Sequence, residues 1–342
     1  MLTASSRLAI FMEGAFEDNT GKMGLGLLRY SERDVVCLVD SRHAGEDIRT
    51  LTGIDRPVPI VATLAEAESL GANVLVLGIA PPGGLIPASW KPWLDEAVSR
   101  GFSLVNGLHD LLSPRYTALR LGQWIWDIRR EPAGLQPGTG AARALPNKRV
   151  LMIGTDMSVG KMTAGLELHK AARRRGINAA FVATGQIGIT ITGRGVPLDA
   201  VRLDYAVGAI EQEVMAVSDA DLVVIEGQGS LIHPGSSATL PLIRGSFPTH
   251  FILCHRAGMA SLPRVPWVQV PPLDQVTGLY ENLAAACGAF PRPRTVGIAL
   301  NTAHLEPAAA EDACRRLEDQ LGLPVQDPVR DGTDRLLAAL QQ

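Results

Sequence analysis

The residues best suited to chemistry form a glycine-containing turn, GTDMSVGK, that runs from Gly154 to Lys161. An apolar run at 149–153 precedes the turn and a helical pattern at 164–175 follows it, so the turn joins a strand to a helix. In that setting backbone N–H groups and the helix amino terminus supply partial positive charge, and a lysine adds a full charge. The sequence therefore predicts a phosphate-binding loop composed of Gly154, Thr155, Asp156, Met157, Ser158, Val159, Gly160, Lys161, Met162 and Thr163.

Two positions depart from the nucleotide-binding pattern G-x-x-x-x-G-K-[ST]. Thr155 stands at the first glycine, and Met162 stands where a hydroxyl would ligate magnesium. Thr163 lies one residue further along the helix, about 100° around its axis. We therefore expect a loop that binds phosphate without magnesium-dependent hydrolysis, and no bound metal.

Further polar candidates follow the next apolar runs. Glu226 ends the run at 222–225 and is the best acidic candidate; the alternative is a carboxylate that only caps a neighbouring helix. His233 stands in a Pro/Gly-containing loop, where a histidine can reach a substrate for proton transfer. Thr184 and Gln186 follow another run and can form hydrogen bonds at the same sheet edge, where such folds bind ligands.

Three other features are candidate parts of a site. Cys254 and His255 are adjacent in a predicted strand and so point to opposite faces, which disfavours a cysteine nucleophile paired with this histidine. Arg256 follows that strand and can bind a carboxylate through two parallel hydrogen bonds, although a surface role fits it equally. Lys22 and His43 are candidate lining residues in the first half of the chain.

The elements around these residues alternate between strand and helix. In the first half, apolar runs at 7–12, 34–39, 73–77 and 102–105 indicate strands, with a helix at 23–30. A stretch rich in Pro, Gly, Ala and Arg follows, and a second series has runs at 149–153, 179–183, 222–225, 250–253, 267–270 and 295–300 before a helix at 307–321. This predicts an α/β protein with a Rossmann-like domain at 1–130, a linker at 131–147 and a P-loop NTPase-like parallel-sheet domain at 148–342.

Composition bears on the expected partners, location and cysteine chemistry of the protein. The net charge is −3 and no basic stripe is present, so nothing favours a nucleic-acid partner. With no signal-like start and no apolar run long enough for a membrane helix, we expect a cytoplasmic enzyme without membrane contact. Its four cysteines are scattered without CxxC spacing, which predicts reduced, mostly buried thiols. Enzymes of this size commonly form homo-oligomers, and we expect one here.

The whole chain resembles a bacterial two-domain P-loop family, formerly of unknown function, whose characterised members include D-glutamate N-acetyltransferases. The segments that carry this resemblance are EGAF at 13–16, TGK at 20–22, VDSRHAG at 39–45, the loop 154–163, ATGQIG at 183–188, EGQGS at 226–230 and CHR at 254–256. The phosphate loop alone is also similar to that of dethiobiotin synthetase, which has threonine at the position of Met162.

The resemblance implies transfer of an acetyl group from acetyl-CoA to the amine of D-glutamate, with the loop holding the CoA phosphates. Such a reaction needs a base, donors for an oxyanion and cations for the substrate carboxylates. We assign Glu226 or His233 as the base, and backbone N–H groups with Gln228 as oxyanion donors. Lys22, Arg194 and Arg256 are assigned to the carboxylates. The alternatives are an ATP- and magnesium-dependent ligase or kinase of the dethiobiotin-synthetase type and a non-catalytic nucleotide or CoA sensor.

Overall fold

The computed structural model describes residues 2–17 and 19–341, which form two compact units. The N-terminal unit contains the residues up to Glu131 together with Gln186–Ala200. The C-terminal unit contains Pro132–Gly185 and the residues from Val201 onward. The chain thus leaves the second unit for fifteen residues and then returns to it.

The N-terminal unit is built on a six-stranded parallel sheet in the order β3-β2-β1-β4-β5-β6. Its strands are β1 (Arg7–Phe11), β2 (Asp34–Val39), β3 (Ile60–Val61), β4 (Val74–Leu77), β5 (Ser103–Asn106) and β6 (Ile125–Asp127). Its α-helices are α1 (Lys22–Tyr30), α2 (Ile48–Thr52), α3 (Leu64–Ser69), α4 (Lys91–Arg100) and α6 (Gln186–Thr192). Short 3-10 turns cover Asn19–Gly21, Pro82–Gly84, Ala88–Trp90 and Leu198–Ala200. The four strands and the helix expected in this half are confirmed.

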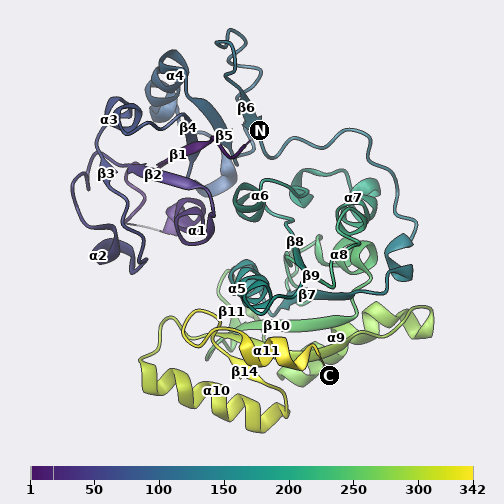
Figure 1. Ribbon diagram of the computed structural model, residues 1–342. Coiled ribbons are helices and arrows are strands. Elements are labelled where there is room, and N and C mark those ends of the chain that lie inside the picture. The colour runs from purple at the N-terminus through teal and green to yellow at the C-terminus, as the bar shows by residue number, and fades with distance from the viewer. Residues whose placement is uncertain (1, 18, 342) are drawn as a thin grey trace. The chain divides into compact units, whose positions relative to one another are not determined.

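Helices cover both faces of this sheet (Figure 1), with α3 and α4 on one side and α1 on the other. The excursion that carries α6 packs against α1. It is fixed by Arg33, whose guanidinium donates to the carbonyl of Ile191 at 2.7 Å, and by Arg129, which pairs with Asp199 at 2.9 Å. Side-chain contacts therefore hold residues from the middle of the chain on the N-terminal unit.

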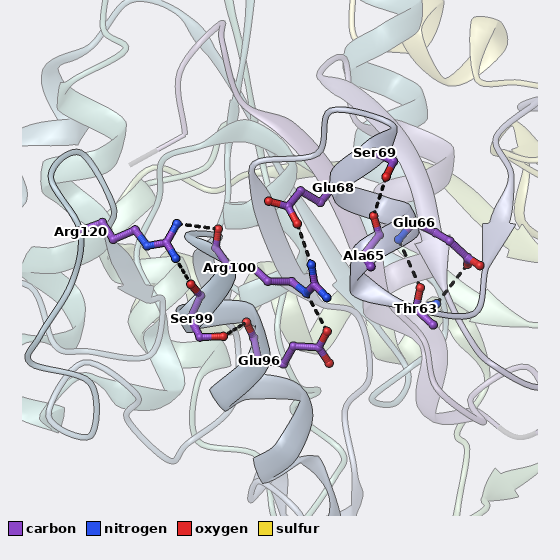
Figure 2. A network of polar contacts seen from close by, with 9 residues as sticks. All are labelled: Thr63, Ala65, Glu66, Glu68, Ser69, Glu96, Ser99, Arg100 and Arg120. Atoms are coloured by element: carbon purple, nitrogen blue, oxygen red, sulfur yellow. Dashed lines mark hydrogen bonds and ion pairs between the residues drawn. The ribbon is translucent and has the colours of Figure 1, made fainter.

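A polar network joins α3 to α4 (Figure 2). The Arg100 guanidinium contacts Glu96 of its own helix at 2.7 Å and Glu68 of α3 at 2.8 Å. Thr63 and Glu66 form a reciprocal capping box at the start of α3, which satisfies backbone N–H groups that the helix leaves unpaired. Because the ion pairs are partly exposed, they add little to stability.

The C-terminal unit has its own six-stranded parallel sheet, in the order β14-β13-β10-β7-β9-β8. Its strands are β7 (Lys148–Gly154), β8 (Ala179–Val182), β9 (Leu222–Ile225), β10 (His250–Arg256), β13 (Arg294–Asn301) and β14 (Val325–Gln326). Its α-helices are α5 (Lys161–Arg174), α7 (Leu203–Met215), α8 (Thr239–Ser246), α9 (Leu273–Ala285), α10 (Pro307–Leu321) and α11 (Asp334–Ala339), with 3-10 turns at Ala141–Ala144 and Ala286–Gly288. The parallel sheet expected in this half is confirmed.

The alternation of side chains along the strands separates the two helix layers. Gly165 of α5 lies against Met152 of β7 and Val224 of β9, which point to one face. Phe251 of β10 is in register with Leu151, so it points to the other face, where its ring meets that of Tyr280 in α9. The helices α5 and α9 therefore cover opposite faces of the sheet.

One predicted strand is wrong in its placement. Residues 267–270 were expected to continue the parallel series, but β12 (Val265–Gln269) pairs antiparallel with β11 (Ser261–Leu262) in a separate two-stranded hairpin. The side chain of Trp267 is 75% exposed there. An antiparallel pair needs only a short connection, so a β-branched and aromatic run can form a hairpin outside the main sheet.

Most of the cysteines are buried, and the helices do not resemble membrane spans among the residues that the structure describes. Cys37, Cys254 and Cys314 are buried free thiols, as expected, but Cys287 is exposed because it lies in a surface turn after α9. Within residues 2–17 and 19–341, no helix combines the length and the apolar character needed to cross a membrane.

Candidate active site

The phosphate loop connects β7 to α5 at the carboxyl edge of the C-terminal sheet. The amide of Thr155 donates to the carbonyl of Cys254, which fixes the start of the loop on the neighbouring strand. Ser158 and Gly160 both have positive φ, +57° and +108°, so the backbone turns sharply before the helix. Among the described residues, the N–H groups of Ser158, Val159 and Gly160 have no hydrogen-bond acceptor. Such a series of free N–H groups at a helix start suits an anion.

Lys161 supplies the cation of this loop. Its side chain is only 6% exposed, and its ammonium donates to the carbonyl of Asp156 at 2.7 Å. Burial lowers the pKa of Lys161, while the charges of Cys254, Asp156 and Glu226 oppose that shift. The ammonium is thus held against the backbone of its own loop.

Gly227 makes room for this lysine. A Cβ atom at Gly227 would collide with the carbonyl oxygen of Met152 and lie 3.0 Å from Cδ of Lys161. The glycine after Glu226 therefore lets the end of β9 approach β7 and the lysine closely.

Glu226 follows β9 and is 5% exposed. Its Oε2 accepts hydrogen bonds from the amides of Thr184 at 2.8 Å and Gly185 at 3.1 Å. Burial raises the pKa of Glu226 to about 7, against the opposing effects of those two amides and of Lys161. The carboxyl group thus binds the backbone of the turn after β8, and its pKa of about 7 lies near neutral pH. A structural role for this carboxylate is therefore compatible with a functional one.

Gln228 and Thr184 are tied to the same turn. The side-chain amide of Gln228 donates to the carbonyl of Thr184, and the Thr184 hydroxyl donates to the carbonyl of Glu226 at 2.9 Å. Thr184 is fully buried, whereas Gln228 is partly exposed. A primary amide has two N–H bonds, so Gln228 retains one for a ligand.

His233 lies in the loop after β9 and is 9% exposed. Its Nδ1 accepts a hydrogen bond from the amide of Gly235 at 3.0 Å, and its Nε2 is 4.0 Å from the carboxylate of Asp156 in the phosphate loop. Neutral imidazole with an accepting Nδ1 carries its proton on Nε2. The structure therefore places His233 beside the phosphate loop, with its Nε2 facing Asp156 beyond hydrogen-bond distance.

Cys254 and His255 do not form a nucleophile–base pair. Burial raises the pKa of Cys254 to about 12 and lowers that of His255 to about 4. The Nδ1 atom of His255 lies 3.0 Å from the hydroxyl of Thr155, so this histidine supports the phosphate loop. The adjacent Arg256 is exposed at the end of β10, at the same sheet edge.

The remaining predicted residues belong to the N-terminal unit. Lys22 is the exposed first residue of α1, Gln186 is the first residue of α6, and Arg194 is exposed after that helix. His43 contacts the fully buried carboxylate of Asp40 through Nδ1 at 2.6 Å. The C-terminal unit thus contains the phosphate loop, Thr184, Glu226, Gln228, His233 and Arg256, and the N-terminal unit contains the other four predicted residues.

The sequence pattern did not reveal Tyr280. Its hydroxyl donates to the carbonyl of Gly154 at 3.0 Å and accepts the amide of Leu231 at 3.0 Å. It lies in the amphipathic helix α9, where an aromatic residue is ordinarily part of the core. No local signal distinguishes it from a packing residue.

Comparison with known proteins identifies the family. A model described as the P-loop domain of DUF1611, a domain of unknown function, matches residues 136–337. A second model, the Rossmann-like N-terminal domain of the same family, matches residues 41–131. The chain belongs to the DUF1611 family. The resemblance inferred from the sequence motifs is thereby confirmed.

Similar proteins from three bacteria extend this comparison. A D-glutamate N-acetyltransferase from Tritonibacter scottomollicae is 40% identical over 283 residues, and one from a Pseudoalteromonas species is 37% identical over 283 residues. Each alignment covers 81% of this chain and 84% of the relative. The crystal structure of a DUF1611 family protein from Anabaena variabilis matches with a TM-score of 0.94 and 51% identity, covering 98% of this chain and 99% of that one.

Proposed function

We propose that this protein transfers the acetyl group of acetyl-CoA to the amine of D-glutamate. The observation that carries the proposal is that relatives 37% and 40% identical are named D-glutamate N-acetyltransferases. The alignments cover most of both chains, so they extend well beyond the phosphate loop.

The chemistry of the phosphate loop supports CoA as its ligand. CoA carries a pyrophosphate and a ribose phosphate, and acyl transfer breaks none of their bonds. A loop that only holds phosphate needs free N–H groups and a cation, here at 158–160 and Lys161. It does not need the hydroxyl that Met162 replaces, because that hydroxyl serves magnesium in phosphoryl transfer.

The acceptor must lose a proton before it can attack. In our proposal Glu226 takes this proton from the ammonium, and the amine then attacks the thioester carbonyl to form the C–N bond. Collapse of the tetrahedral oxyanion breaks the C–S bond, the nitrogen loses its second proton to become an amide, and the CoA thiolate takes up that proton as it leaves. A pKa of about 7 suits Glu226 to this role, because a base works best with a pKa near the operating pH.

Glu226 is preferred to His233 as the base. The accepting Nδ1 of His233 leaves its Nε2 protonated, so the neutral ring has no free lone pair for a substrate proton. Gln228 and backbone N–H groups of the loop are proposed as oxyanion donors. Direct transfer is favoured, because the thiol of Cys254 is buried and its pKa is about 12.

The substrate carboxylates require cations. Arg256 is our proposed partner in the C-terminal unit, and Lys22 and Arg194 are our proposed partners in the N-terminal unit. Thr184, Gln186 and His43 remain proposed substrate-site residues. Since the hydroxyl and amide of Thr184 are used within the protein, its proposed contribution is to fix Glu226.

The proposal is tested by measuring thiol release from acetyl-CoA with D-glutamate, L-glutamate and D-aspartate as acceptors. Turnover with D-glutamate, identified as N-acetyl-D-glutamate by mass spectrometry, is expected, with much slower turnover of the L-isomer. The Glu226→Gln variant should lose turnover while retaining acetyl-CoA binding. Absence of turnover in wild type, with acetyl-CoA still bound, would favour a sensor; ATP consumption dependent on magnesium would favour a ligase or kinase.

A further inference from the structure

Tyr280 connects two parts of the candidate site through one hydroxyl group. Its side chain is completely buried in α9, and its ring packs edge-to-face on Phe251 with centroids 6.0 Å apart. The hydroxyl donates to the carbonyl of Gly154, where the phosphate loop begins. It also accepts the amide of Leu231, in the loop that carries Gln228 and His233. One phenol thus joins the end of β7 to the loop after β9.

The other hydrogen bonds of the loop after β9 reach its own residues, the start of α8 and, through Gln228, the carbonyl of Thr184. The amide of Ser230 donates to the hydroxyl of Ser236 at 3.0 Å, and the hydroxyl of Thr239 donates to the carbonyl of Gln228 at 3.1 Å. His233 accepts the amide of Gly235. Among the described residues, none of these bonds reaches the phosphate loop, and Nε2 of His233 lies 4.0 Å from Asp156, beyond hydrogen-bond distance.

We propose that Tyr280 is a positioning residue that sets the phosphate loop at the correct distance from Gln228 and His233. This inference rests on the proposed acetyl transfer, since it concerns the alignment of bound acetyl-CoA with the groups that stabilise its transition state. Alignment matters because small displacements of reacting groups lower the rate strongly. Phenylalanine would fill the same space but would leave the carbonyl of Gly154 and the amide of Leu231 without this partner.

Tyr280→Phe in the full chain tests the proposal. We expect kcat for acetyl transfer to fall about tenfold, the equivalent of about 1.4 kcal/mol in the barrier. The Kd for acetyl-CoA should change less than about threefold, because the N–H groups and Lys161 that hold phosphate remain. Tyr116→Phe is the matched control, since it removes a hydroxyl bonded to Asp95 at 2.7 Å in the N-terminal unit. That variant should keep wild-type kinetics.

A merely structural tyrosine would behave differently. Wild-type kcat in Tyr280→Phe, with or without a lower melting temperature, would overturn the proposal. If the variant does not fold, hydrogen exchange in the wild-type protein gives the answer instead. The Leu231 amide should then exchange as slowly as the core amides of α9, and exchange at the rate of an exposed loop would overturn the proposal. Wild-type protein without any acetyl-transfer activity would refute the proposed function itself, which is a separate outcome.

Discussion

Glu226 provides the most detailed prediction, because its buried carboxyl group links stability to activity. Its folded pKa of about 7 compares with 4.5 for a free glutamate. The native state therefore binds a proton more tightly than the unfolded state, and folding takes up a proton between pH 4.5 and 7. Over this window the contribution of Glu226 to stability is lost as pH rises. At about 1.4 kcal/mol per pKa unit, the loss is about 3 kcal/mol above pH 8.

Glu226→Gln removes this titration. The free energy of unfolding of the variant, measured against wild type by urea denaturation, should gain about 3 kcal/mol between pH 4 and pH 8.5. Wild-type kcat/KM should rise with pH through about 7, as the carboxylate base forms, and the variant should lose roughly 100-fold or more at its plateau.

Glu211→Gln is the matched control for the stability measurement. Burial acts to raise the pKa of Glu211, but hydrogen bonds from Thr139 and Ala141 outweigh it, so the net shift is downward. Glu211 therefore stabilises the native state above its unfolded pKa and loses that effect as pH falls. The difference between variant and wild type should run in the opposite direction with pH. A difference that is flat with pH for Glu226→Gln, or activity retained in that variant, would refute the reasoning.

Two further substitutions probe the phosphate loop and the glycine that packs against it. Met162→Thr restores the hydroxyl of the common nucleotide-binding pattern. Calorimetry should find the Kd for acetyl-CoA within about threefold of wild type, because our proposal assigns no metal to the loop. A loss of affinity above tenfold would show that the methionine contacts the ligand. Gly227→Ala forces a Cβ into the carbonyl of Met152, so chemical denaturation should show a loss of more than about 2 kcal/mol. A neutral effect on stability would mean that the end of β9 shifts freely.

The sequence predicts the phosphate loop well, because the signal is local. An apolar strand, a glycine-containing turn with a lysine and a helical pattern occur in order, and β7 and α5 flank the loop as expected. Strand positions follow from apolar runs for the same reason. The hairpin of β11 and β12 could not be predicted in this way, since the apolar run at 267–270 is equally compatible with a strand of the main sheet.

Three features of the site depend on contacts that the sequence does not encode locally. The raised pKa of Glu226 arises from burial at the end of β9, which lies between β7 and β8 only in the assembled sheet. The role of Tyr280 depends on two backbone groups that are 126 and 49 residues away in the chain. The segment from Gln186 to Ala200 joins the N-terminal unit through Arg33 and Arg129, and no composition change marks that excursion.

The most direct test of the central claim is calorimetric titration of the purified protein with acetyl-CoA and, separately, with ATP and magnesium, each repeated with Lys161→Ala. We predict binding of acetyl-CoA that weakens at least tenfold in the variant, since the buried ammonium of Lys161 is our proposed phosphate partner, and no comparable signal with ATP. Tight, magnesium-dependent ATP binding with no response to acetyl-CoA would contradict the account.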